Sequence, residues 1–429
     1  MNDVAAVLET IERNIERDAE RSFALLERLV GQASTVGHES GAQEVVGSEL
    51  AAMGLRPEKM MIDDSIGNDP LAGVPALSYA NRFNVVASPA SPGNSPSLLL
   101  NGHIDVVPVS DSGWTNPPFS PVRRDGWLYG RGAGDMKAGF ASTLHALRHV
   151  FDQVPELRDA PLTFLSVIEE ECTGNGTLAA LRAGISADAV LLPEPTDLRL
   201  LMGGVGVSWI AIRLELGGGH AESSDRLGSP ADLLGELLAA LKELEATYNE
   251  SADAYLSAVP HPYNLNVGKV SMGDWPSSVA SLLHLEVRVG HSRSRDSQSV
   301  LDDVRALVHR VAGGLADTSV SVHRHGFRAE PYHLDDEHAL AGAMRFVCRA
   351  ATGLDATPYS LGSTTDARYY VNQAKVPALC FGPTVRNMHG TDESVEMSSI
   401  VRASKTYAHL VVNYFVHGGL GGYESGRWV

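Results

Sequence analysis

The stretch LLLNGHIDVVP, residues 98–108, takes an apolar segment directly into His103 and Asp105. The leucines predict a buried strand, and α/β sheets place their sites at the carboxyl ends of such strands. The imidazole of His103 can offer a nitrogen to a metal ion, and Asp105 can accept a hydrogen bond from the other ring nitrogen. Taken alone, this pattern is more often a buried histidine beside a turn, so the prediction of a site needs other segments.

The segments around this stretch alternate between strand and helix patterns. Short apolar strands are predicted at residues 84–87, 97–101, 162–168, 189–192 and 376–381, and helices at 4–29, 43–53, 137–150, 336–350 and 398–414. Strands separated by helices are typical of a mostly parallel sheet with both faces covered. We therefore expect an α/β catalytic domain.

In the middle of the chain, the predicted strands and helices follow a different order. Strands are predicted at residues 207–216, 265–270, 282–289 and 319–323, with helices at 229–248 and 298–311. This β-α-β-β-α-β order is the ferredoxin-like pattern. We expect an inserted α+β lid domain at residues 207–326, between the two parts of the catalytic domain at 1–206 and 327–429.

Composition narrows the classes of function. The chain has 429 residues and a net charge of −18, which argues against nucleic-acid binding because phosphate binding needs a basic surface. No apolar run is long enough for a membrane span, and the first 23 residues lack the pattern of a signal peptide. The three cysteines, Cys172, Cys348 and Cys380, form no paired framework. A reduced, cytoplasmic compartment is expected.

A second segment with chemical character is YGRGAGDMKAG, residues 129–139. Glycines surround Asp135, and their small size lets the backbone bring a carboxylate close to other ligands. The two oxygens of one carboxylate can bridge two cations. The alternative is a glycine-rich phosphate loop, but neither GxxxxGK[ST] nor a GxGxxG fingerprint with its ribose-binding acid is present.

The third segment, FLSVIEEECTGNGT at residues 164–177, ends an apolar strand with Glu169, Glu170 and Glu171. A charge run is usually a solvated face, but this one follows a buried strand. Neighbouring strand residues point in opposite directions, so one glutamate can be a ligand and another a general base. Two weaker segments, AVLLPEPT and FGPTVRNMHGTDESV, place Glu194 and His389 after further strands.

Together these segments supply two histidines and three carboxylates, which is about the set that two cations need in nitrogen and oxygen coordination. The ordered motifs GHxDVVP, GRGxxDMKxG, EE, EPT and H-x-x-DE extend the pattern along the chain. With them the sequence resembles the di-zinc aminoacylase, carboxypeptidase G, acetylornithine deacetylase and succinyl-diaminopimelate desuccinylase family of metallopeptidase clan MH. The resemblance runs from about Leu25 to Tyr414.

The resemblance implies two divalent metal ions per subunit, with Zn²⁺ favoured and Mn²⁺ or Co²⁺ able to replace it. It implies that Asp135 bridges the ions, that His103 and Glu194 complete one site, and that Glu171 and His389 complete the other. Glu170 would be the general base and Asp105 the partner of His103. The family pattern has an acid before the two working glutamates, which puts Glu169 in that first slot. A register shifted by one residue stays open.

The resemblance also assigns roles outside the metal ligands. His220 in LELGGGHAESS would reach the site of a neighbouring subunit in a homodimer and help to hold the oxyanion. Arg288 in the lid would bind a substrate carboxylate, and Arg368 lies in LGSTTDARYY, which matches the family's substrate-side loop. The contexts around His220 and before His389 depart from the family pattern, which leaves the substrate open.

The expected activity is hydrolysis of a C–N bond by water activated at the two metals. The favoured substrate is a small molecule, an N-acyl amino acid or a small peptide-like molecule, and it is expected to carry a carboxylate. Two alternatives stay open. The same site can act on a non-peptide C–N bond, as a deformylase or an aminohydrolase of an aromatic amine such as nitroanthranilate, and the same fold can serve a non-catalytic binding protein. No ligand or base is missing, which disfavours the second alternative.

Overall fold

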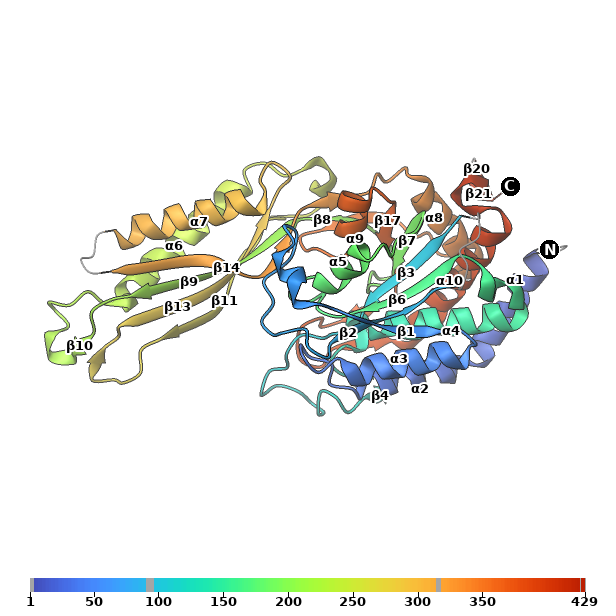
Figure 1. The fold of residues 1–429 in the computed structure, drawn as a ribbon, viewed down its shortest axis with the longest axis horizontal. Coiled ribbons are helices and arrows are strands. Elements are labelled where there is room, and N and C mark those ends of the chain that lie inside the picture. The colour runs from blue at the N-terminus through green and yellow to red at the C-terminus, as the bar shows by residue number, and fades with distance from the viewer. Residues whose placement is uncertain (1–3, 90–95, 314–317, 425, 429) are drawn as a thin grey trace.

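The computed structural model describes residues 4–89, 96–313, 318–424 and 426–428. A broad catalytic domain carries both termini, and an elongated lid domain extends from it (Figure 1). In these described ranges, no helix combines the length and apolar character needed to cross a membrane.

The catalytic domain is built on a nine-stranded sheet with the order β1-β2-β6-β3-β7-β17-β8-β15, and β16 also pairs with β8. The four central strands, β6, β3, β7 and β17, are parallel to one another. The strands are β1 (Pro57–Met61), β2 (Phe83–Ala87), β3 (Leu98–His103), β6 (Leu162–Val167), β7 (Ala189–Leu192), β8 (Leu200–Gly204), β15 (Tyr332–His333), β16 (Pro358–Leu361) and β17 (Ala378–Cys380).

Both faces of this sheet are buried, as its apolar strands predict. Leu98 and Leu100 of β3 pack into one large core cluster, whereas Leu99 packs into a separate cluster on the opposite face. The alternation follows from the two-residue period of a strand. The helices of the domain are α1 (Val4–Arg17), α2 (Ala19–Val30), α3 (Ser40–Ala52), α4 (Ala138–Gln153), α5 (Asn175–Arg182), α8 (Ala339–Thr352), α9 (Ala367–Tyr369) and α10 (Met397–Val416).

The single long helix expected over residues 4–29 is wrong. The structure has two helices, α1 and α2, separated at Asp18, whose ψ of 17° departs from the helical value. Ile11 and Ile15 of α1 and Leu25 and Leu29 of α2 are all buried. The buried apolar residues follow helical spacing in both helices. Periodicity alone therefore does not reveal that the chain changes direction at one residue between them.

The lid domain is a four-stranded antiparallel sheet of order β11-β13-β9-β14. Its elements in chain order are β9 (Gly206–Glu215), α6 (Pro230–Tyr248), β11 (Leu265–Met272), β13 (Leu282–His291), α7 (Ser297–Ala312) and β14 (Ser319–Ala329). Residues from Val205 to Ala329 form a core cluster of their own. The predicted α/β fold with an inserted ferredoxin-like lid is confirmed, while the domain boundaries stay a prediction.

A small second sheet in the catalytic domain has the order β18-β19-β5-β4. Its strands are β4 (Val122–Arg124), β5 (Trp127–Tyr129), β18 (Val385–Arg386) and β19 (Ser394–Glu396). Pairing of Ser394 with Tyr129 brings the 387–393 loop beside the glycine-rich segment that begins at Gly130. Two segments far apart in sequence therefore meet at the edge of the main sheet.

Candidate metal centre

Three neighbouring parallel strands deliver side chains to one edge of the main sheet. His103 is the last residue of β3, Glu170 and Glu171 follow β6, and Glu194 follows β7. Because β6, β3 and β7 run in the same direction, their carboxyl ends meet. His103, Glu170 and Glu194 are buried there.

Asp135 and His389 come to this edge from outside the main sheet. Asp135 lies in the short turn Ala133–Lys137 before α4, with extended φ/ψ values of −107° and 102°, and its peptide bond to Met136 is cis. His389 lies in the loop between β18 and β19 and has a φ of +60°. The pairing of β19 with β5 holds the two loops together.

The carboxylate of Asp135 lies between two histidines. Its Oδ1 is 3.1 Å from Nε2 of His103, and its Oδ2 is 3.4 Å from Nε2 of His389. Each histidine also faces a second carboxylate: Glu194 Oε2 is 3.7 Å from His103, and Glu171 Oε2 is 3.1 Å from His389. The five predicted ligands thus form two half-sites that share Asp135.

The electrostatics of this cluster fit cations. Burial raises the pKa of Glu194 to about 7 and raises that of Glu170 well above its usual range, because ionised carboxylates crowd together away from water. The neighbouring carboxylate of Glu171 raises the pKa of His389 to about 11. Imidazole and carboxylate donors are the ligands that Zn²⁺ and similar ions take. The residues present therefore fit a two-metal centre.

The three adjacent glutamates have different surroundings. Glu169 is fully buried, and its carboxylate accepts hydrogen bonds from Tyr79, Arg82 and Thr173. Glu171 faces His389. Glu169 is therefore committed to contacts within the protein, which leaves Glu170 and Glu171 at the cluster.

Asp105 holds the cluster differently from the sequence prediction. Nδ1 of His103 is 3.0 Å from the backbone carbonyl oxygen of Asp105 and 3.7 Å from its carboxylate. The carboxylate instead accepts hydrogen bonds from the backbone N–H groups of Glu170 and Glu171, each at 3.1 Å. Burial raises the pKa of Asp105 to about 7. The side chain thus positions the glutamate loop, and the backbone orients the His103 ring.

The chain is similar to known proteins over most of its length. The model of peptidase family M20/M25/M40 matches residues 99–413. The chain belongs to this family. The match spans both parts of the catalytic domain and the whole lid, and it confirms the predicted family of metal-dependent hydrolases.

Two curated members of the family are similar over most of this chain. An acetylornithine deacetylase of Pectobacterium atrosepticum is 27% identical over 349 residues, which are 80% of this chain and 86% of that protein. A succinyl-diaminopimelate desuccinylase of a Caulobacter species is 26% identical over 412 residues, which are 92% of this chain and 96% of that protein. Among solved structures, the di-peptidase Dug1p of Saccharomyces cerevisiae superposes with a TM-score of 0.78 at 16% identity, covering 95% of this chain and 98% of its own.

In this M20 chain, a carboxylate that sequence reasoning did not assign supports Asp135. Glu393 is 1% exposed and accepts hydrogen bonds from the backbone N–H groups of Gly132, Gly134 and Asp135 and from the guanidinium of Arg131. Glu393 lies in the motif H-x-x-DE, but its sequence neighbours do not reveal its hydrogen-bond partners. Asp135, for example, lies 258 positions earlier in the chain.

The three residues predicted to serve the substrate lie in different places. His220 is exposed in β10 (Gly219–His220), at the end of the lid far from the catalytic domain (Figure 1). Arg288 on β13 donates hydrogen bonds to the carbonyl oxygens of Asn264 and Gly362, and so lies where the lid meets the catalytic domain. Arg368 is 2% exposed, 3.2 Å from Asp366. Within one chain the structure brings none of the three to the metal ligands by a direct contact.

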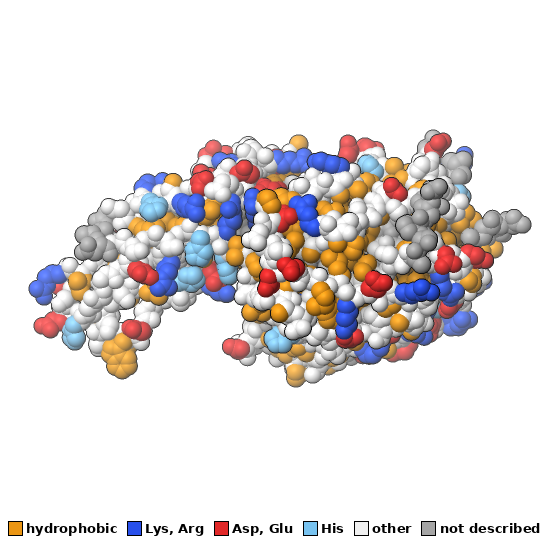
Figure 2. Space-filling view, in the orientation of Figure 1, with side chains coloured by type: hydrophobic (Ala, Val, Ile, Leu, Met, Phe, Trp, Pro, Cys, Tyr) orange, Lys and Arg blue, Asp and Glu red, His pale blue; other side chains and the backbone are white. Residues whose placement is uncertain are grey.

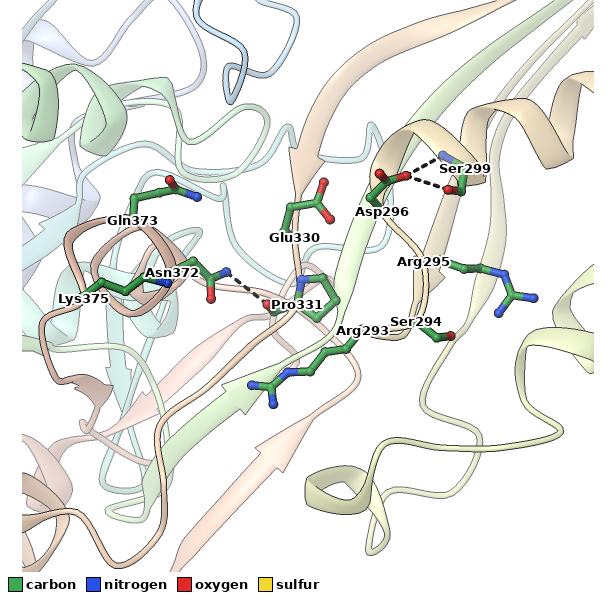
Figure 3. A pocket seen from close by; sticks show the side chains of 10 residues that line it. All are labelled: Arg293, Ser294, Arg295, Asp296, Ser299, Glu330, Pro331, Asn372, Gln373 and Lys375. Atoms are coloured by element: carbon green, nitrogen blue, oxygen red, sulfur yellow. Dashed lines mark hydrogen bonds between the residues drawn. The ribbon is translucent and has the colours of Figure 1, made fainter.

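A hollow of about 530 Å³ lies between the lid and the catalytic domain (Figure 3). It is lined by Arg293, Ser294, Arg295, Asp296, Ser299, Glu330, Pro331, Asn372, Gln373 and Lys375. Within the catalytic domain, Asn372 donates to the carbonyl of Pro331, and on the lid side Asp296 caps α7 by accepting from the backbone N–H of Ser299. None of the predicted site residues lines this hollow.

On the face in Figure 2, acidic and basic side chains are interspersed.

The support of Asp135 by Glu393 can be tested through stability. Glu393→Ala leaves the buried cation of Arg131 without its partner. We expect the free energy of unfolding to fall by about 3–5 kcal/mol, measured by urea denaturation. Glu396→Ala, which removes a partly exposed carboxylate from a surface ion pair three residues away, is the control and should cost less than about 1 kcal/mol. Equal losses for the two variants would contradict the role of Glu393.

Proposed function

We propose that this protein is a metal-dependent hydrolase that cleaves the amide bond of an N-acyl amino acid or a small peptide. The observation that carries the proposal is the position of Asp135, whose two carboxylate oxygens face two different histidines. Each histidine is accompanied by one further carboxylate, so the cluster offers two half-sites rather than one. Membership of the peptidase family supports the same reaction class.

The ligand assignment follows from these contacts. His103 and Glu194 would hold one ion, Glu171 and His389 the other, and Asp135 would bridge them. When bound, a pair of divalent ions polarises the scissile carbonyl and acidifies water. Zn²⁺ suits this donor set, and Mn²⁺ or Co²⁺ can replace it.

Glu170 would be the general base. It is 7% exposed and lies between Glu169, whose carboxylate is bound within the protein, and Glu171, which faces His389. The backbone N–H of Glu170 is held by Asp105, so its Cα position is fixed relative to β3. Its carboxylate would take a proton from the attacking water and deliver that proton to the leaving nitrogen.

The substrate would carry a carboxylate close to its amide. Both curated relatives are named for removing an acyl group from an amino acid, acetylornithine in one and succinyl-diaminopimelate in the other. Arg288 supplies a cation at the junction of the lid and the catalytic domain, and burial lowers its pKa. We assign the substrate carboxylate to Arg288. Arg368, which lies beside Asp366 and the Tyr369 ring, would be a second substrate-binding residue.

The working form would be a homodimer in which each lid completes the other subunit's site. Strand β11 is an edge of the lid sheet, and it exposes Val270 and Met272, with Trp275 exposed just beyond. An open strand edge with apolar side chains favours pairing with a second copy across a two-fold axis. Such an arrangement would carry His220 from the end of one lid toward the partner's metals. The three free cysteines suit a reduced, cytoplasmic compartment.

The first test is metal dependence and substrate class. Chelator treatment should abolish turnover, and Zn²⁺, Mn²⁺ or Co²⁺ should restore it. Hydrolysis is measured for N-acetyl and N-succinyl amino acids, for dipeptides, and for acylated or nitrated aryl amines. Turnover of the first two groups supports the proposal, and turnover restricted to the aryl amines assigns the non-peptide alternative. Full activity in protein shown to be free of metal would contradict metal dependence.

The second test concerns Glu170. Glu170→Gln should leave both ions bound, because it changes no ligand, and should lower kcat by about 10²–10⁴-fold through loss of proton transfer. Bound metal is measured by elemental analysis beside kcat. Glu171→Gln is the matched control and should lose an ion. If instead Glu170→Gln loses the ion and Glu171→Gln keeps it, the two roles are shifted by one residue.

The third test concerns His220. His220→Ala should retain both ions and lower kcat by about 10²–10³-fold, the usual cost of removing one donor to an oxyanion. Mixing inactive Glu170→Gln subunits with His220→Ala subunits should then recover activity, since one site of each mixed dimer is whole. His284→Ala, a lid histidine beside Glu286, is the control for a non-specific effect. Subunit exchange without recovery would show that His220 does not act across the interface.

A further inference from the structure

A second group of metal-binding side chains lies away from the catalytic cluster. Ligand atoms of Asp18, His145 and His149 lie within 4.8 Å of one another. Asp18 stands at the break between α1 and α2, and both histidines lie on α4. The family motifs do not include any of the three.

The fold presents the two imidazoles as a pair. His145 and His149 are four residues apart on α4, so they lie one helical turn apart on the same face. Their ring centroids are 4.6 Å apart and the rings are nearly perpendicular, at 89°. The break at Asp18 brings a carboxylate to this face, with Oδ2 at 3.6 Å from Nε2 of His149. The three donors therefore come from two chain segments that pack against each other.

One nitrogen of each imidazole ring has no hydrogen-bond partner among the described residues. Nε2 of His145 is 3.1 Å from the carbonyl oxygen of Ile15, so Nε2 carries the proton and Nδ1 keeps its lone pair. Nδ1 of His145 and Nε2 of His149 are both buried and unpartnered among the described residues. Buried polar atoms normally have a partner, so two in one group point to an absent ligand. The contact with Ile15 also fixes the ring as metal-binding histidines require.

The charges around the group permit a cation. Burial lowers the pKa of His145 to about 4 and also lowers that of His149, so both rings are neutral at pH 7, which is the ligating form. Asp18 and Asp152 are the nearby carboxylates. Of the nearby cations, Arg148 is paired with Glu49 at 3.0 Å, and Arg21 is exposed to solvent.

We propose that Asp18, His145 and His149 bind a divalent cation of the Zn²⁺ type, separate from the catalytic centre. Two imidazole nitrogens and one carboxylate oxygen are Zn²⁺ ligands, and water can occupy the fourth tetrahedral position through the partly exposed Asp18. Bonds of about 2.0–2.1 Å require ligand atoms about 3.3 Å apart, so small side-chain rotations suffice. The ion is structural: it ties the break between α1 and α2 to α4, whose first turn follows Asp135.

The test is the number of ions bound to the full chain. The protein is dialysed to equilibrium against Zn²⁺ at pH 7.5, and bound zinc per chain is measured by elemental analysis. Wild type should bind one zinc more than Asp18→Asn and one more than His149→Gln. Because the result is a difference between variants, it does not depend on how far the catalytic centre is filled. If the protein lacked the proposed hydrolase activity, the expected difference in bound zinc between wild type and the variants would be the same.

The controls separate this site from general effects. Asp152→Asn removes a nearby exposed carboxylate that is not a proposed ligand, and it should bind as much zinc as wild type. Asp18→Asn changes a partly exposed side chain and keeps its size, so it tests the site even where His149→Gln fails to fold. Zn²⁺ should also raise the melting temperature of wild type more than that of Asp18→Asn. Equal zinc content in wild type and Asp18→Asn would overturn the proposal, as would loss of the ion in Asp152→Asn alone.

Discussion

The contact of the Asp135 carboxylate with both His103 and His389 is the constraint on which the rest of the site depends. It requires a strand end, a turn and a distant loop to converge on the two oxygens of one side chain. Carboxylates crowded at such a point repel one another when buried, and compensating cations relieve that repulsion. The crowding of these carboxylates is therefore a local electrostatic cost that bound cations would offset.

Close backbone packing makes this convergence possible. A Cβ at Gly139 would lie 1.9 Å from the carbonyl oxygen of Pro193, so only glycine lets the start of α4 approach the segment that carries Glu194. At the other end of the turn, Lys137 is fully buried, donates to the carbonyls of Leu29 and Gln32, and has a pKa lowered by burial to about 7. The glycine-rich motif thus allows the close packing around Asp135 and also carries Asp135 itself.

The lid has its own core and its own sheet, so its shape does not depend on the metal centre. It is tied to the catalytic domain by short connections on either side of the lid and by Arg288, which reaches Gly362. Because of this independence, side chains of the lid can vary without disturbing the cluster around Asp135.

The sequence by itself determined the fold class, the order of the lid elements and a set of five side chains that the fold brings together around Asp135. These rest on local signals: apolar periodicity, and polar residues at the ends of buried strands. Tertiary structure alone decided that Glu393 holds Asp135, that the backbone of Asp105 orients His103, and that one helix breaks at Asp18. Such details depend on which groups satisfy each other's hydrogen bonds across up to 258 positions, and no local pattern records that pairing.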